Sequence, residues 1–288
     1  MAQSMKDIKR RIKSVKNIKQ ITNAMELVSS AKLRKSRKKL EQTRPYYETV
    51  SESIRELLAE TKGVDNPLLE KREIKKRAVI VLTADRGLAG AYNANAIRKA
   101  EEILEDGVDT ILVTSGVKGT DYFKYRKYEI EKSMLHISEN PKSQDAAEIG
   151  EYVLELYRKK EIDQVLIVYT RFNSALNLVP MVEQILPAEN LNQKNRDNKE
   201  YKPIYIEYEP DPYVLLDKMI SQYINISVLG YLLESSASQQ AARRTAMENA
   251  TDNAEELIED LGLKYNRARQ ASITQEISEI VGGAEALK

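Results

Sequence analysis

The sequence contains no cysteine and no tryptophan, and it has a single histidine, His136. Without cysteine the chain can form neither disulfide bonds nor thiolate metal sites, and it can carry out no thiol chemistry. With one histidine, a catalytic triad or a metal cluster would need carboxylates for its other members. We therefore interpret His136 as a packing or surface residue, and we expect no catalytic, metal-binding or cofactor-binding residues.

Long apolar runs are also missing. Runs such as "VLIVY" are far shorter than the roughly 20 residues of a membrane-spanning helix. The N-terminal stretch "MAQSMKDIKRRIK" lacks the apolar core of a signal peptide. These absences predict a soluble or peripheral protein that reaches a membrane only through a partner.

Proline is nearly absent from both ends of the chain, and glycine is absent from the first. Residues 1–62 have no glycine and only Pro45, whereas residues 213–288 have no proline and four glycines. Because both residues disfavour helix interiors, this distribution predicts long terminal helices. We expect an N-terminal coiled-coil helix over 1–62, a Rossmann-like α/β domain over 63–209 and a C-terminal coiled-coil helix over 210–288.

The two terminal segments have matching apolar stripes and opposite charges. Residues 1–40 carry thirteen lysines and arginines against two acids, whereas residues 245–288 carry nine acids against four bases. An antiparallel coiled coil would bury both stripes and pair the opposite charges. The expected stripe positions are Ile8, Ile12, Val15, Ile18, Ile21, Met25 and Val28 at one end, and Ala250, Ala254, Leu257, Leu261, Ile273, Ile277, Ile280, Ala284 and Leu287 at the other.

The middle segment alternates between short apolar runs and amphipathic stretches, which is typical of a mostly parallel sheet covered on both faces. We expect helices over 92–107 and 143–160, an antiparallel edge strand over 177–186 and a polar loop over 190–200. The expected strands are residues 77–84, 109–115, 163–170 and 202–208, and the amphipathic stretches lie between the first three.

The turn "LTADRGLAGAYN" after the first expected strand resembles a phosphate-binding turn. Only Gly87 and Gly90 are present there, whereas a dinucleotide fingerprint needs G-x-G-x-x-G, and the chain contains no P-loop. One hypothesis is a nucleotide-dependent α/β enzyme that uses this turn. The competing interpretation is a tight strand-to-helix connection with Asp85 near a helix start.

The basic cluster "KLRKSRKK" (32–39) raises a further hypothesis, a coiled-coil protein that binds nucleic acid. No aromatic residue is interleaved with these charges, and no known nucleic-acid-binding pattern surrounds them. A basic surface that meets an acidic partner protein explains the cluster equally well.

Several motifs resemble the gamma subunits of rotary F-type ATP synthases. The C-terminal "ITQEISEIVGGAEAL" (273–287) is similar to that family's C-terminal motif, and "LTADRGLAGAYN" is similar to its central turn. The stretch "IKRRIKSVKNIKQITNAMELVSSAKLRKS" is similar to that family's N-terminal helix, and "YEPDP" (208–212) is similar to its entry into the long C-terminal helix. The resemblance spans nearly the whole chain.

The resemblance implies a non-catalytic central rotor, present once per complex on the cytoplasmic face of a bacterial cell membrane. Its implied partners are the alpha and beta subunits, the epsilon subunit and the c-subunit ring, through which alone it meets the membrane. It implies no nucleic-acid partner and no cofactor. The coupling ion, proton or sodium, stays open.

The resemblance also implies two groups of contact residues. The first group matches the positions that meet the beta subunits: Met25, Arg269, Gln270, Thr274 and Glu276. The second group matches the positions on the stalk and ring side: Lys32, Arg34, Lys35, Glu207 and Tyr208.

Overall fold

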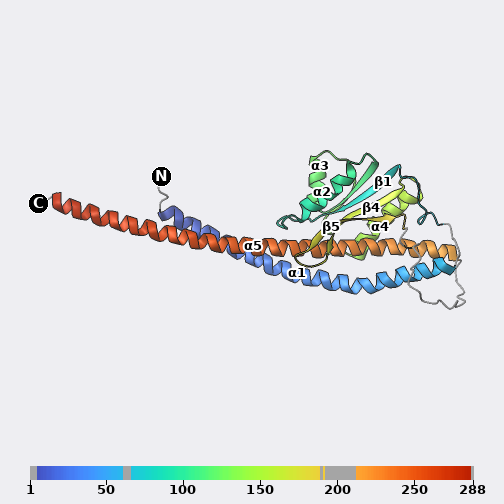
Figure 1. Cartoon of the computed structure of the whole chain (residues 1–288), viewed down its shortest axis with the longest axis horizontal. Coiled ribbons are helices and arrows are strands. Elements are labelled where there is room, and N and C mark those ends of the chain that lie inside the picture. The colour runs from blue at the N-terminus through green and yellow to red at the C-terminus, as the bar shows by residue number, and fades with distance from the viewer. Residues whose placement is uncertain (1–4, 61–65, 189–190, 192–211, 287–288) are drawn as a thin grey trace. The chain divides into compact units, whose positions relative to one another are not determined.

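A computed structural model of the chain describes residues 5–60, 66–188, 191 and 212–286 (Figure 1). The chain forms two compact units. The first unit joins residues 1–29 to residues 243–288, and the second comprises residues 30–242. Two long helices, α1 (Met5–Glu60) and α5 (Pro212–Ala286), contribute residues to both units.

The second unit contains a five-stranded sheet with the order β3-β2-β1-β4-β5. The first four strands in sequence pair in parallel, and β5 runs antiparallel to β4 at one edge. Parallel strands are buried on both faces, which accounts for the continuous apolar run "AVIVL" in β1. The strands are β1 (Lys76–Leu82), β2 (Asp109–Ser115), β3 (Ile130–Met134), β4 (Gln164–Phe172) and β5 (Leu178–Leu186).

Helices cover both faces of the sheet (Figure 1). On one face, α2 (Tyr92–Leu104) and α3 (Val117–Tyr125) pack over Val79 and Val81. On the other face, α4 (Ser143–Arg158) and the adjoining parts of α1 and α5 bury the larger apolar cluster. That cluster includes Ile54, Ile80, Ile149, Ile167, Leu216, Ile220 and Val228.

Within each unit α1 and α5 run antiparallel. In the second unit the hydroxyls of Tyr47 and Tyr223 form a hydrogen bond at 2.9 Å, and those of Ser36 and Ser236 form one at 3.2 Å. In the first unit the Thr251 hydroxyl donates to Thr22 at 2.8 Å. The predicted pairing of the terminal helices in an antiparallel coiled coil is therefore confirmed.

The buried seam of α1 departs from the predicted stripe. Ile8 is buried as predicted, but Ile18, Ile21 and Val28 are exposed. The seam steps in a 4–3 heptad rhythm: it includes Ile12 and Val15 of the predicted stripe, and then runs through Lys19, Thr22 and Ser29. The predicted stripe takes consecutive steps of three residues from Ile12 to Ile21, and such steps rotate away from a 3.5-residue seam.

The predicted C-terminal stripe on α5 is only partly buried. Ala254 and Leu261 are buried, whereas Leu257, Ile273, Ile277 and Ile280 are exposed. Leu287 lies outside the described residues. The stripe positions from Ile273 onward therefore present apolar surface to the outside of this unit.

Most strand predictions agree with the sheet, and the predicted antiparallel edge is β5. The expected strand over 202–208 and most of the polar loop over 190–200 lie outside the described residues. One element was not predicted, α3, because the glycines in "SGVKGT" disfavour a helix. Among the helices in the described ranges, none is long and apolar enough to cross a membrane.

Candidate functional site

The turn after β1 is organised around the carboxylate of Asp85. This side chain accepts hydrogen bonds from the backbone amides of Val117 at 3.2 Å, His136 at 2.8 Å and Ser138 at 3.1 Å. The Ser138 hydroxyl also donates to it at 2.6 Å and accepts from the Asp85 amide. Asp85 therefore joins three connections at the carboxyl end of the parallel strands, where α/β proteins often bind ligands.

The N-terminus of α3 donates its free amides to the protein itself. The amides of Val117, Lys118 and Gly119 donate to the Asp85 carboxylate, to the Ala84 carbonyl and to the Thr83 hydroxyl, respectively. A helix N-terminus binds phosphate through free amides of this kind. Because these three donors already have partners, the turn is built as a structural joint, and the nucleotide-enzyme hypothesis gains no support.

Two glycines allow the start of α3 to pack closely against Thr83, which directly follows β1. A Cβ on Gly116 would lie 2.3 Å from the Thr83 carbonyl oxygen, and one on Gly119 would lie 2.7 Å from the Thr83 side chain. Gly87 and Gly90, the glycines of the sequence motif, have room around them. Gly90 has a φ of +54°, so glycine is favoured there by the backbone conformation of the turn and not by close packing against another element.

The connection after β3 also reaches both long helices of the second unit. The Ser138 carbonyl accepts from the Gln239 side chain of α5 at 2.5 Å. Lys32 of α1 pairs with Glu139 at 2.7 Å, and Lys39 donates to Asn140 at 2.7 Å. Two members of the basic cluster therefore bind this chain's own α/β domain.

The remaining charges of that cluster, including Arg34 and Lys35, are exposed on α1. Arg37 lies over the ring of Phe172, with its Cζ atom 5.9 Å from the ring centroid, so this aromatic ring packs against the cluster from the chain's own sheet. The nucleic-acid hypothesis is not supported. Arg34 and Lys35 stay predicted partner contacts.

The predicted contact residues near the end of α5 lie on an open helix surface. Arg269, Gln270, Thr274 and Glu276 are all exposed. Thr274 donates within the helix to the Gln270 carbonyl at 3.0 Å, and Glu276 accepts from Ser272. Their polar groups are interleaved with exposed isoleucines, of which Ile280 is 71% exposed.

Met25 is half-buried in the coil of the first unit, beside an exposed apolar group on α1. That group consists of Ile18, Ile21, Leu27 and Val28. Lys19 pairs with Glu255 at 2.7 Å, so the coil itself uses one of the basic side chains here. Glu207 and Tyr208 lie outside the described residues.

Sequence reasoning missed the polar run of α5 that faces the α/β domain. Residues 235–241, "SSASQQA", are all buried, and their side chains bond to the sheet and to the loop after β3. The available signal was an uninterrupted run of small and uncharged polar residues, because a helix with one face in solvent would show charged residues at regular intervals along that face.

In the described residues, no group of three histidine, aspartate or glutamate side chains could hold a metal ion.

Comparisons with known proteins agree on one family. A family model described as ATP synthase matches residues 4–287. The chain is 50% identical to the ATP synthase gamma chain of Alkaliphilus metalliredigens, with 100% of each chain covered. It is 46% identical to the sodium ion specific ATP synthase gamma chain of Acetobacterium woodii, again with 100% of each covered.

Solved structures agree with these relatives. A chain from the central stalk and c ring of the Tetrahymena thermophila mitochondrial ATP synthase has a TM-score of 0.62 and 27% identity. That match covers 80% of this chain and 99% of the other. A chain of the Euglena gracilis mitochondrial ATP synthase, at 21% identity and a TM-score of 0.58, shares the fold; the match covers 92% of this chain and 95% of that one.

Proposed function

The chain belongs to the family of ATP synthase gamma chains, the non-catalytic central stalk of F-type ATP synthases, and we propose that α1 and α5 form its rotating shaft. The shaft couples ion-driven rotation of the membrane ring to conformational change at the catalytic subunits. In this mechanism the chain breaks no bond. It acts by making different contacts with the surrounding subunits in each orientation, which shifts their conformational equilibrium.

One observation carries this proposal. From Ile273 to Val281, the last turns of α5 expose four large apolar side chains, Ile273, Ile277, Ile280 and Val281, between polar ones. An isolated helix surface of this kind is unfavourable in water, because apolar groups gain free energy when they are buried. A surrounding sleeve of partner subunits would cover it and still let polar groups form changing contacts.

We assign that sleeve to the alpha and beta subunits, with Met25, Arg269, Gln270, Thr274 and Glu276 at the beta contacts. We assign Lys32, Arg34, Lys35, Glu207 and Tyr208 to the stalk and ring side, where the epsilon subunit and the c ring would bind, although Lys32 also pairs with Glu139 of this chain. The exposed charges of Arg34 and Lys35 suit an acidic partner surface. One copy would serve each complex.

The family's complex is membrane-associated, and we place this chain at the cytoplasmic face of the cell membrane. Contact with the membrane would be indirect, through the ring.

The test mixes the purified chain with alpha and beta subunits and measures complex formation and ATP hydrolysis. We expect a stable complex with one copy of this chain and a hydrolysis rate above that of alpha and beta alone. Replacing Ile273, Ile277 and Ile280 with aspartate should weaken the complex by about tenfold for each residue replaced, because roughly 1.5 kcal/mol is lost for each buried isoleucine.

The matched control is Leu176→Asp, which changes an exposed leucine in the turn between β4 and β5. It should leave both complex formation and hydrolysis unchanged. If the wild-type chain forms no complex with alpha and beta, the shaft proposal fails. If the triple variant binds as tightly as the wild type, the assignment of the sleeve to the end of α5 fails.

A further inference from the structure

The strand β4 continues past the end of its parallel neighbour β1. The last residue pair between them is Val81 with Val168, and β4 runs on to Phe172. On its other side β4 stays paired with β5, where Pro180 lies opposite Thr170. The edge of β4 that β1 leaves uncovered, at Thr170 and Phe172, therefore needs other hydrogen-bond partners.

Side chains of α5 supply those partners. The Thr170 amide donates to the Ser235 hydroxyl at 3.4 Å, and the Ser238 hydroxyl donates to the Thr170 carbonyl at 2.9 Å. The Phe172 amide donates to the Glu234 carboxylate. Positions 234, 235 and 238 share one face of a helix, so α5 takes the place of a missing strand along this edge. These five residues form what we term the β4-edge joint.

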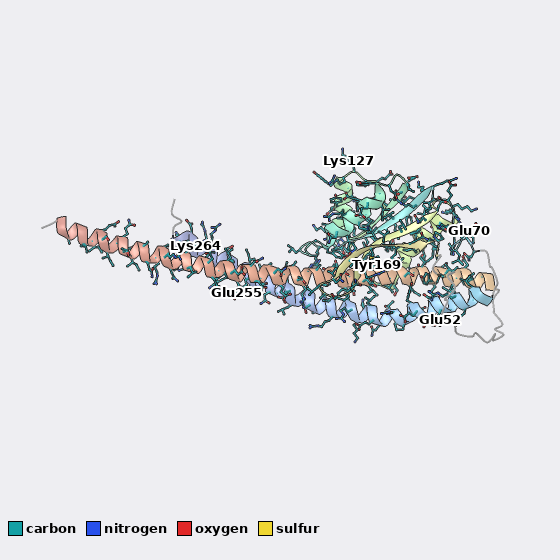
Figure 2. All side chains as sticks on the ribbon, viewed as in Figure 1. Glu52, Glu70, Lys127, Tyr169, Glu255 and Lys264 are labelled. Carbon is teal, nitrogen blue, oxygen red and sulfur yellow. The ribbon has the colours of Figure 1, made fainter. Side chains whose placement is uncertain are left out.

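The packing around the joint is tight. Tyr169, whose ring centroid lies 4.6 Å from that of Tyr231 on α5, sits where the sheet meets this helix (Figure 2). Next to the joint, Ala237 and Ala241 of α5 pack with Leu33 of α1. Small side chains let the helix lie close enough for serine hydroxyls to reach the strand backbone.

Glu234 is an unusual choice for such a position. Its Oε2 atom is buried and has no hydrogen-bond partner in the described structure. The charged groups that face it are Arg171 of β4, Glu183 of β5 and Arg44 of α1. Arg171 is already held by Glu183 at 2.8 Å and donates to the Tyr169 hydroxyl at 3.2 Å. A carboxylate kept here without an ion-pair contact of its own costs stability, which points to a role other than stability.

We propose that the β4-edge joint carries torque between the α/β domain and the shaft helix α5, with Glu234 as its positioning residue. This inference rests on the proposed function. Apolar contacts between helix and sheet are non-directional and permit small slips. Hydrogen bonds from three side chains to one strand edge have fixed directions, and a helix that rotates or slides must break them together.

The test uses the complete ATP synthase in vesicles and measures ions pumped per ATP hydrolysed, for both protons and sodium ions. Glu234→Leu removes the acceptor of the Phe172 amide, and we expect the pumping ratio to fall about threefold or more. Glu234→Gln keeps an acceptor oxygen and should retain the wild-type ratio. Glu151→Leu is the matched control, because it makes the same change on the exposed face of α4.

The thermal unfolding midpoint of each isolated chain separates torque from folding. The midpoint of Glu234→Leu should stay near that of the wild type, since relief of the buried charge offsets the lost hydrogen bond. If Glu234→Leu does not fold, the double variant Ser235→Ala with Ser238→Ala decides the question, and it too should lower the ratio.

Two failures can be told apart. If the wild-type chain assembles and pumps, and both Glu234→Leu and the double serine variant pump with the wild-type ratio, the joint carries no torque and the inference is wrong. If the wild-type chain itself neither assembles nor supports pumping, the proposed function fails.

Discussion

The hydroxyl of Ser138 lies 2.6 Å from the carboxylate of Asp85, and the Ser138 amide donates to the same carboxylate at 3.1 Å. This pair connects the turn after β1 to the loop after β3. That loop in turn binds α5 through Gln239 and α1 through Lys32. A turn that resembles a phosphate site in sequence is thus a mechanical connection between the sheet and the two long helices.

Asp85→Ala should lower the free energy of unfolding by about 3 kcal/mol, because several donors lose a charged acceptor. Asp121→Ala, a change at an exposed aspartate of α3, should have an effect within about 0.5 kcal/mol. Urea denaturation of both variants measures the difference. Equal stability of the two variants would contradict the role of Asp85 as the organising residue of the turn.

Alanine substitutions at three glycines should show which of them the fold needs for close packing. Gly116→Ala should destabilise the chain most, by roughly 3 kcal/mol or more, because its Cβ would overlap the Thr83 carbonyl and its φ is +92°. Gly90→Ala should cost about 1 kcal/mol for its φ of +54° alone. Gly87→Ala, whose nearest contact is the flexible Lys118 side chain at 3.7 Å, should be close to neutral.

The same isolated chain offers a direct check on the enzyme hypothesis. Calorimetric titration of the wild-type chain with ATP and with NAD should give no saturable binding in the micromolar range. Binding that Gly116→Ala or Asp85→Ala abolishes would mean that the turn is a nucleotide site after all.

Stability should depend on pH through Glu234. Burial raises the pKa of this carboxyl, with Arg171, the Phe172 amide and Arg44 acting in the opposite direction. Because the folded pKa lies above the unfolded value, the stabilisation is fully present below the unfolded pKa and is lost as the pH rises through the folded pKa. Glu234→Gln should therefore gain stability over the wild type at pH 8, on the order of 1 kcal/mol.

That gain should shrink as the pH is lowered and disappear well below the unfolded pKa, where Glu234 is protonated in both states. Urea denaturation at several pH values measures the difference, with Glu151→Gln as the surface control. A gain that does not change with pH would show that Glu234 does not titrate in this range.

Two isoleucines of α1 test the position of the coiled-coil seam. Ile21 is 59% exposed, so Ile21→Ala should change the free energy of unfolding by less than about 0.5 kcal/mol. Ile8 is 4% exposed, so Ile8→Ala should cost about 2 kcal/mol or more. If Ile21→Ala were the more destabilising change, the seam would follow the stripe drawn from sequence and not the heptad rhythm.

The architecture could be predicted from sequence because it depends on strong local signals. Ends with a single proline between them, buried β-branched runs and the amphipathic stretches between those runs determine long helices and a parallel sheet, and these agree with the structure. The short helix α3 was hidden by Gly116 and Gly119, which are needed for packing against Thr83.

The contacts between the helices and the domain could not be predicted in the same way. The α1 seam contains Lys19, Thr22 and Ser29, which an apolar search passes over. The β4-edge joint depends on where β1 stops, and that relationship between strands far apart in sequence has no local signal. Polar residues that bond across elements become recognisable only when the elements are placed together.

Rotation of the chain inside the catalytic subunits tests the central claim most directly. Because the sequence has no cysteine, Tyr125→Cys at an 86% exposed position of α3 gives this chain one thiol for a probe. With the alpha and beta subunits fixed to a surface, we predict that the probe rotates in one direction when ATP is added and stops when ATP is removed. A complex that hydrolyses ATP while the probe stays still, or moves without direction, would contradict the account.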